Sequence, residues 1–149
     1  MKETDLYRKD LEELLSGAGL ILVELVVSRH RGSTQVRAVI YAPVGTGIDE
    51  CSRAHRLLQP RLQILLGVQD FHLEVASPGL DRWIRSEREY SIFVGRGVRI
   101  LSAEGGDWLL GRIEMAGPSA VTIRSASGVR VVEYASIAKA RLDCAQGGA

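Results

Sequence analysis

The stretch LEVASPGLDRWIR, residues Leu73–Arg85, contains the sharpest change of pattern in the chain. Its first residues alternate between apolar and polar side chains, which is typical of a strand with one buried face. Ser77-Pro78-Gly79 then ends the alternation, because proline fixes φ and glycine permits a positive φ. Beyond this turn most of the chain has the pattern of strands. We therefore predict two domains, residues 1–82 and 83–149.

The residues before the turn predict the element order α-β-β-α-β. Apolar residues recur at helical spacing over residues 5–16 and again over 49–66. Pro60 interrupts the second helix, so we expect a kink or a break near Gln59. Two helices packed on one face of a three-stranded sheet would bury the apolar surfaces of both layers.

Three stretches of period two predict the strands of that sheet. The first two surround the polar turn HRGS, residues 30–33, and the third is residues 71–75. The expected core residues of the three strands are Ile21, Val23, Leu25 and Val27; Val36, Ala38, Ile40 and Ala42; and Phe71, Leu73 and Val75. The opposite face would carry Glu24, Arg37, Tyr41, His72 and Glu74, which is usually the composition of a solvated surface.

The residues after the turn predict a short helix over 86–93 and then about five short strands. This number of strands, at a spacing of roughly ten residues, favours a small closed barrel. Gly111 lies inside one of these strands, where glycine suits the sharp bend that such a barrel needs. The fold class is therefore α+β.

Composition narrows the possible partners. The formal net charge of the 149 residues is only +1, so nucleic acid would have to be bound by a local basic patch. Cys51 and Cys144 are far apart and form neither a disulfide framework nor a zinc motif. The amino terminus has no apolar signal core and no apolar run is long enough to span a membrane. We expect a cytoplasmic protein.

A search for catalytic chemistry finds no matching motif. The histidines His30, His55 and His72 are dispersed, and no pair has the spacing of zinc ligands. Ser77 follows a strand, as nucleophiles often do, but Pro78 cannot supply the next N–H that a nucleophile elbow uses for its oxyanion hole. We predict no enzyme activity, no cofactor, no metal and no small-molecule substrate.

Charged residues gather after the turn around Trp83. Asp81, Arg82, Arg85 and Arg88 surround this aromatic residue in the sequence. One interpretation is a contact with RNA or protein, and the other is an interdomain hinge held by ion pairs. The local chemistry does not distinguish the two.

Several motifs resemble those of the ribosome maturation factor RimP family. LEVASPGLDR, residues 73–82, is similar to that family's E-V-S-S-P-G-x-D-R-P-L signature, and IAKARL, residues 137–142, to its closing strand. GLILVELVVSR, DECS and FVGRGVRI resemble further family segments in register, so the likeness spans nearly the whole chain. Trp83 and Ile84 depart from the family's Pro-Leu, which removes a stiff point after the turn.

The resemblance implies a C-terminal SH3-like (Sm-like) β-barrel and a monomeric, non-catalytic factor for maturation of the small ribosomal subunit. Its expected partners are a ribosomal protein and ribosomal RNA of the free or immature subunit. Ser77, Pro78, Gly79, Asp81, Arg82 and Trp83 are the expected motif and joint residues. Arg85, Arg88, Lys139 and Arg141 are candidate partner-binding residues. A general RNA-binding module and a protein-interaction adaptor remain the alternatives.

Overall fold

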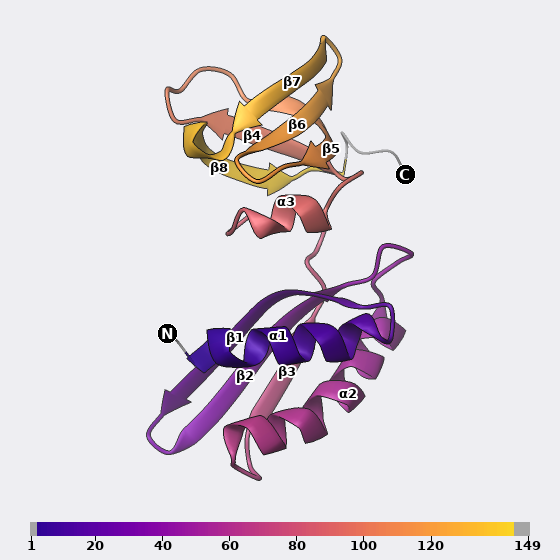
Figure 1. Cartoon of the computed structure of the whole chain (residues 1–149), viewed down its shortest axis with the longest axis vertical. Coiled ribbons are helices and arrows are strands. Elements are labelled where there is room, and N and C mark those ends of the chain that lie inside the picture. The colour runs from indigo at the N-terminus through magenta and orange to yellow at the C-terminus, as the bar shows by residue number, and fades with distance from the viewer. Residues whose placement is uncertain (1–2, 145–149) are drawn as a thin grey trace. The chain divides into compact units, whose positions relative to one another are not determined.

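A computed structural model describes residues 3–144 of the chain. Within this range the fold is mixed α and β, with three α-helices and two sheets (Figure 1). The chain divides into two compact units, Met1–Pro78 and Gly79–Ala149. The predicted boundary between residues 82 and 83 lies four residues after this division, and the independence of the two units as domains stays a prediction.

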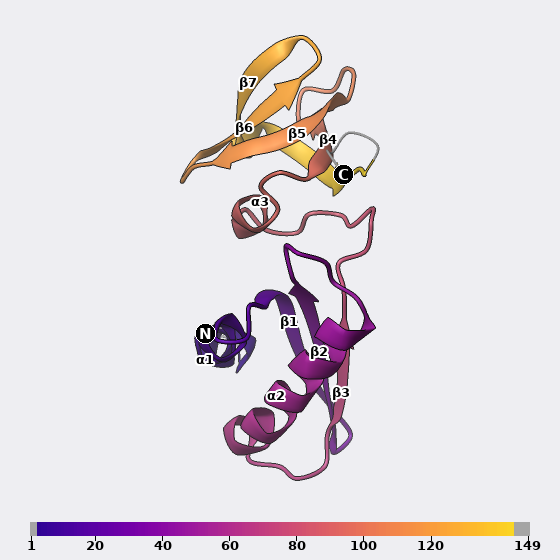
Figure 2. The ribbon, with the colours of Figure 1, turned by 90° about the vertical axis from the view of Figure 1, so that its right-hand side faces the viewer.

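The first unit has the predicted order α-β-β-α-β. Its elements are α1 (Glu3–Ser16), β1 (Ile21–His30), β2 (Ser33–Tyr41), α2 (Ile48–Leu66) and β3 (His72–Ala76). β1 and β2 form an antiparallel hairpin, while β3 pairs in parallel with β2, so β2 is the central strand. Figures 1 and 2 show both helices on the same side of this sheet.

A two-residue turn joins β1 to β2. Arg31 and Gly32 both have positive φ, 51° and 78°, which matches the twist of the flanking strands. The predicted polar turn over residues 30–33 is therefore confirmed, and it sets the register of the hairpin.

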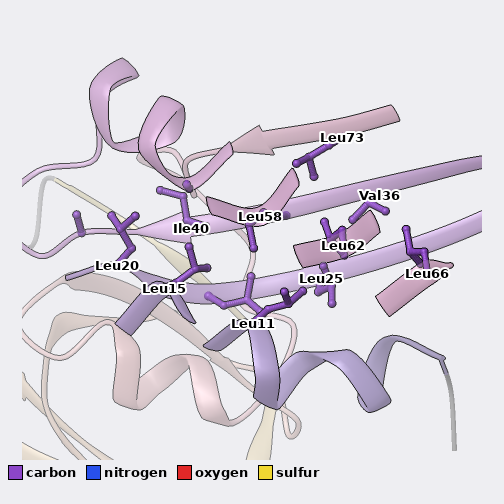
Figure 3. Close-up of a cluster of buried hydrophobic side chains, with 14 residues drawn as sticks. Leu11, Leu15, Leu20, Leu25, Val36, Ile40, Leu58, Leu62, Leu66 and Leu73 are labelled. Carbon is purple, nitrogen blue, oxygen red and sulfur yellow. The ribbon is translucent and has the colours of Figure 1, made fainter. Parts of the chain in front are cut away.

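The core of the first unit lies between the helices and the sheet (Figure 3). Leu11 and Leu15 of α1 and the buried leucines of α2 point toward the apolar face of β2, as predicted from the helical spacing. Leu6, which the same spacing predicts on the buried face of α1, is 59% exposed, so that part of the prediction is wrong. The members that are less than 2% exposed are Leu11, Leu15, Leu20, Leu22, Val36, Ala38, Ile40, Ala42, Ala54, Leu58 and Leu62.

The strict alternation predicted for β1 is wrong at Val23. The pairing with β2 shifts between Leu22 and Glu24, so Val23 is the extra residue of a β-bulge. Because a bulge shifts which residues face the core, Leu22 and Leu25 join the core cluster whereas Ile21 and Val23 do not. Val23 is nevertheless buried, as predicted, at 1% exposure.

Helix α2 runs without interruption through Pro60, so the predicted alternative of a break is wrong, while the alternative of a kink stays a prediction. Proline removes one hydrogen bond, but four buried residues of α2, Ala54, Leu58, Leu62 and Leu66, keep a continuous apolar face. At the start of the helix, the Gly47 N–H donates to Oε1 of Glu50 at 2.7 Å. Gly67 ends the helix with a left-handed φ of 70°.

The second unit is mainly β. It contains α3 (Arg88–Ile92), β4 (Gly97–Ser102), β5 (Leu109–Ala116), β6 (Ala120–Ser125), β7 (Gly128–Glu133), the 3₁₀ turn η1 (Tyr134–Ser136) and β8 (Ile137–Leu142). The five strands are antiparallel, in the order β7-β6-β5-β4-β8. β7 and β8 do not pair with each other within residues 3–144, so the predicted closed barrel is not found.

Gly111 has a packing reason to be glycine. A Cβ placed there would lie 2.6 Å from the carbonyl oxygen of Arg124 and 2.7 Å from Cγ2 of Ile123. The glycine therefore permits a close approach of β5 to β6.

Candidate functional site

Ser77 and Pro78 end the first unit, directly after β3, and Gly79 begins the second. Gly79 has a φ of 81°, a conformation that side-chain-bearing residues rarely adopt. Because Pro78 has no N–H, it cannot donate to an oxyanion beside Ser77. The local geometry is that of a turn.

A shallow cavity of about 530 Å³ nevertheless lies beside Ser77 in the first unit. Its walls include Cys51 and His55 from α2, together with Val75 from β3. Burial and the nearby Glu50 raise the pKa of the Cys51 thiol, which disfavours the thiolate. Within residues 3–144, no hydrogen bond joins Ser77 to either side chain.

On the outward face of the first sheet, one arginine is paired with two carboxylates. The guanidinium of Arg37 lies 3.5 Å from the Glu24 carboxylate and 3.4 Å from that of Glu74. This confirms that the three predicted charged residues lie together. A cation held between two carboxylates leaves little net attraction for phosphate.

The segment after Gly79 lies along β8 in the second unit. The Ile84 N–H donates to the Ala140 carbonyl at 2.9 Å, and the Leu142 N–H donates to the Arg82 carbonyl at 2.9 Å. Trp83 forms an antiparallel bridge with Arg141 between these bonds. Residues 82–84 are therefore fixed on the sheet of the second unit, and Trp83 is held beside β8.

A buried ion pair anchors the same segment. Arg82 donates to Glu89 through Nε at 2.8 Å and Nη2 at 3.3 Å, and the two side chains are only 7% and 2% exposed. The Arg85 N–H and the Ser86 hydroxyl also donate to Glu89, at 3.2 Å and 3.4 Å. Buried charges persist when they are paired and hydrogen-bonded, so Arg82 has a structural role here.

Two tryptophans and two cations form a cluster that we call the tryptophan patch, composed of Trp83, Trp108, Lys139 and Arg141. The two indole rings are 6.5 Å apart and tilted by 51°. Lys139 Nζ lies 5.6 Å from each ring centroid, and Arg141 Cζ lies 5.4 Å from that of Trp83. These distances are within the range of cation–π attraction.

The patch is open to solvent. Trp83 is 44% exposed, an unusually large fraction for an indole, and Lys139 is exposed as well. Asp81, 76% exposed, makes a long ion pair of 3.9 Å with Arg141. The Arg141 side chain is 37% exposed, although its Nε is buried and has no hydrogen-bond partner within the described residues.

The structure thus brings Asp81, Trp83, Lys139 and Arg141 together, although they come from two separate motifs. Arg85 lies on the rim of a second cavity, of about 150 Å³, which Lys139 also lines. Arg88 is the first residue of α3. No partner-binding role of these residues follows from placement alone.

Two important residues were not predicted from the sequence, Trp108 and Glu89. Trp108 follows a polar loop and its only signal is that it is the second of two tryptophans in the chain. Glu89 lies among charged residues, and nothing in its neighbourhood distinguishes a buried carboxylate from an exposed one.

Two further findings concern metal binding and membrane insertion. No three side chains of His, Cys, Asp or Glu are grouped to hold a metal ion anywhere in residues 3–144. In the same part of the chain, no helix is both long enough and apolar enough to cross a membrane.

Comparison with known proteins finds similarity to one family. Residues 10–81 match the model of the RimP N-terminal domain. A protein named ribosome maturation factor RimP from Borrelia hermsii is 29% identical over 124 residues, covering 83% of this chain and 85% of that protein. A protein of the same name from Borrelia turicatae is 29% identical over 83 residues, covering 56% of this chain and 57% of that protein. Since 124 residues exceed the length of the first unit, the likeness extends into the second. In both comparisons the chain is similar to members of the RimP family.

Proposed function

We propose that this chain is a ribosome maturation factor that acts on the small ribosomal subunit and is not an enzyme. The observation that carries the proposal is the likeness to the Borrelia hermsii protein of that name, which covers 83% of this chain. The match of residues 10–81 to the RimP N-terminal domain supports it independently.

The proposed partner is the free or immature small subunit, through both ribosomal protein and ribosomal RNA. The tryptophan patch supports a binding role, since an exposed cluster of aromatic and basic side chains is typical of interaction surfaces. Arg85 and Arg88, near the patch in the sequence, are proposed to extend the contact. We further propose that the protein acts as a monomer in the cytoplasm.

The two units are proposed to be separate domains, with the second a member of the SH3-like (Sm-like) barrels. Support comes from its five short antiparallel strands and from the 3₁₀ turn η1 before the last one. The close approach at Gly111 and the shift in pairing between Ile113 and Met115 would both help a small sheet to curve.

A binding protein without catalytic chemistry acts by shifting a folding equilibrium. It can do so only to the extent that its affinity differs between the two states of its partner. We propose that this protein prefers a partly assembled subunit and dissociates when maturation hides its site. The turn geometry at Ser77, which is hydrogen-bonded to no base among residues 3–144, supports a mechanism without covalent steps.

Deletion of the gene tests the proposal in the cell. The expected result is a sucrose-gradient profile with more free subunits and fewer assembled ribosomes, restored by the wild-type chain and equally by Ser77→Ala. A normal ratio of free to assembled subunits in the deletion strain would contradict the proposed function. Restoration by wild type but not by a well-folded Ser77→Ala would contradict the non-catalytic mechanism.

A further inference from the structure

The chain has only two tryptophans, and the structure places both in one surface cluster, where Trp83 is exposed and Trp108 is half-buried. Trp83 belongs to the segment that pairs with β8, whereas Trp108 immediately precedes β5. A core position would remove more of the apolar indole ring from water, but Trp83 remains 44% exposed. The arrangement keeps aromatic surface available at a fixed position on the second unit.

The cations of the patch limit the kind of ligand that would fit. Lys139 and Arg141 lie within 5.6 Å of the Trp83 ring, so flat apolar surface and positive charge occur together. An apolar peptide would cover the indoles but leave the cations desolvated, and an acidic peptide would neutralise the cations but cover little of the indoles. A nucleotide carries a stacking ring and a negative charge a few ångströms apart, so it complements both features.

We propose that the tryptophan patch binds single-stranded RNA, with a base stacked on the exposed indole surface and Lys139 and Arg141 contacting phosphates. This RNA contact would be part of the proposed function. It rests on the proposed function only for which RNA is bound. The Arg141 side chain is 37% exposed and its ion pair with Asp81 is long, 3.9 Å, so the exposed part of its guanidinium can contact a phosphate.

Asp81 restrains the affinity of the patch. Its carboxylate is 76% exposed and lies 3.9 Å from Arg141, where it competes with phosphate and repels it. The chain as a whole has a net charge of only +1, so binding depends on the patch and not on a general basic surface. Weak, local and salt-sensitive binding is therefore expected.

The position of the tryptophans supplies a direct assay. Because both indoles are in the patch, the whole tryptophan emission of the full-length chain reports on it. Titration with a single-stranded oligouridylate of ten nucleotides is expected to quench this emission to saturation. A duplex of the same length, whose bases are already stacked and paired, is expected to quench far less.

The salt dependence of the association constant reports how many RNA phosphates the patch contacts. Two contacts predict that the logarithm of the association constant falls with the logarithm of salt concentration with a slope of about −1.4, from roughly −0.7 per phosphate on single strands. Lys139→Gln is expected to reduce the slope to about −0.7, whereas Arg56→Gln, an exposed residue of α2 in the first unit, changes the net charge equally and leaves it unchanged.

Substitutions at Trp83 separate stacking from packing. Measured by anisotropy of a labelled decauridylate, Trp83→Leu is expected to weaken binding at least about fivefold, the lower end of the range for one stacked base. Trp83→Phe keeps an aromatic ring and is expected to retain most of the affinity. Asp81→Asn is expected to strengthen binding roughly twofold to fivefold. Far-ultraviolet circular dichroism of each variant establishes that the fold is kept.

Several outcomes would overturn the proposal. These are no saturable quenching by the decauridylate, equal affinity of folded Trp83→Leu and wild type, or an unchanged salt slope in Lys139→Gln. If the wild-type chain does not bind the oligonucleotide but still binds immature small subunits, the proposed RNA contact is wrong and the proposed function still holds. If folded variants of the tryptophan patch then lose subunit binding, the patch contacts protein instead. That result also overturns the proposed RNA contact.

Discussion

Removing Arg82 should destabilise the second unit far more than removing any exposed arginine. Arg82→Met keeps the aliphatic bulk of the side chain but leaves the Glu89 carboxylate, 2% exposed, without its cation. Breaking a buried ion pair in this way costs about 3–5 kcal/mol in free energy of unfolding. Glu89 keeps the N–H of Arg85 and the hydroxyl of Ser86 as donors, so the lower end, about 3 kcal/mol, is expected.

A second substitution tests the cause of this loss. In Arg82→Met/Glu89→Gln the buried group is neutral, and its oxygen can still accept from the Arg85 N–H. We expect the double variant to be more stable than Arg82→Met alone by about 2 kcal/mol, because the penalty of an unpaired buried charge is removed. The matched control is Arg124→Met, which breaks a pair with Glu114 that is 52% and 39% exposed and should cost less than about 1 kcal/mol.

Urea denaturation followed by tryptophan emission measures these differences. Both tryptophans lie in the second unit, so the emission follows the unfolding of that unit and not of the first. If Arg82→Met costs no more than Arg124→Met, or if the double variant is less stable than the single one, then Arg82 does not act by neutralising a buried carboxylate.

The remaining predictions concern both units. Gly111→Ala should destabilise the second unit by about 1–3 kcal/mol in the same assay, because its Cβ would lie 2.6 Å from a carbonyl oxygen; no loss would refute the close approach. Pro60→Ala should stabilise the first unit by about 1–3 kcal/mol, followed by circular dichroism in urea, since it restores a hydrogen bond in α2; a destabilised variant would contradict this. The Arg61 guanidinium lowers the pKa of Asp10 from its usual value of 3.8, so the stability from this pair is present above about pH 4 and is lost as the pH falls further. Between pH 5 and pH 3, Arg61→Gln should therefore lose less stability in urea than Arg56→Gln does, and equal losses would exclude this contribution.

Much of the first unit could be predicted because its elements follow simple periodicities. The spacing of Leu11, Leu15, Leu58 and Leu62 predicts the two helix faces that the structure buries. The error at Val23 has a specific cause: a bulge depends on the pairing partner, and the pattern of a single strand does not contain it. The break predicted at Pro60 was wrong because packing of α2 outweighs one lost hydrogen bond.

The candidate site could be predicted only in part. The sequence pointed to Trp83 through its departure from a motif, and to Lys139 and Arg141 through a second motif far along the chain. Their meeting depends on the pairing of residues 82–84 with β8, which is a long-range contact without a local signal. Trp108 enters the patch from a loop before β5, and no periodicity places a loop residue.

Comparative binding to assembly intermediates tests the central claim most directly. The full-length chain would be titrated against purified immature small subunits and against mature ones, at the same salt concentration. The proposed mechanism predicts tighter binding to the immature particle, because only a difference in affinity can drive maturation forward. Equal affinity for both particles, or no binding to either, would contradict it.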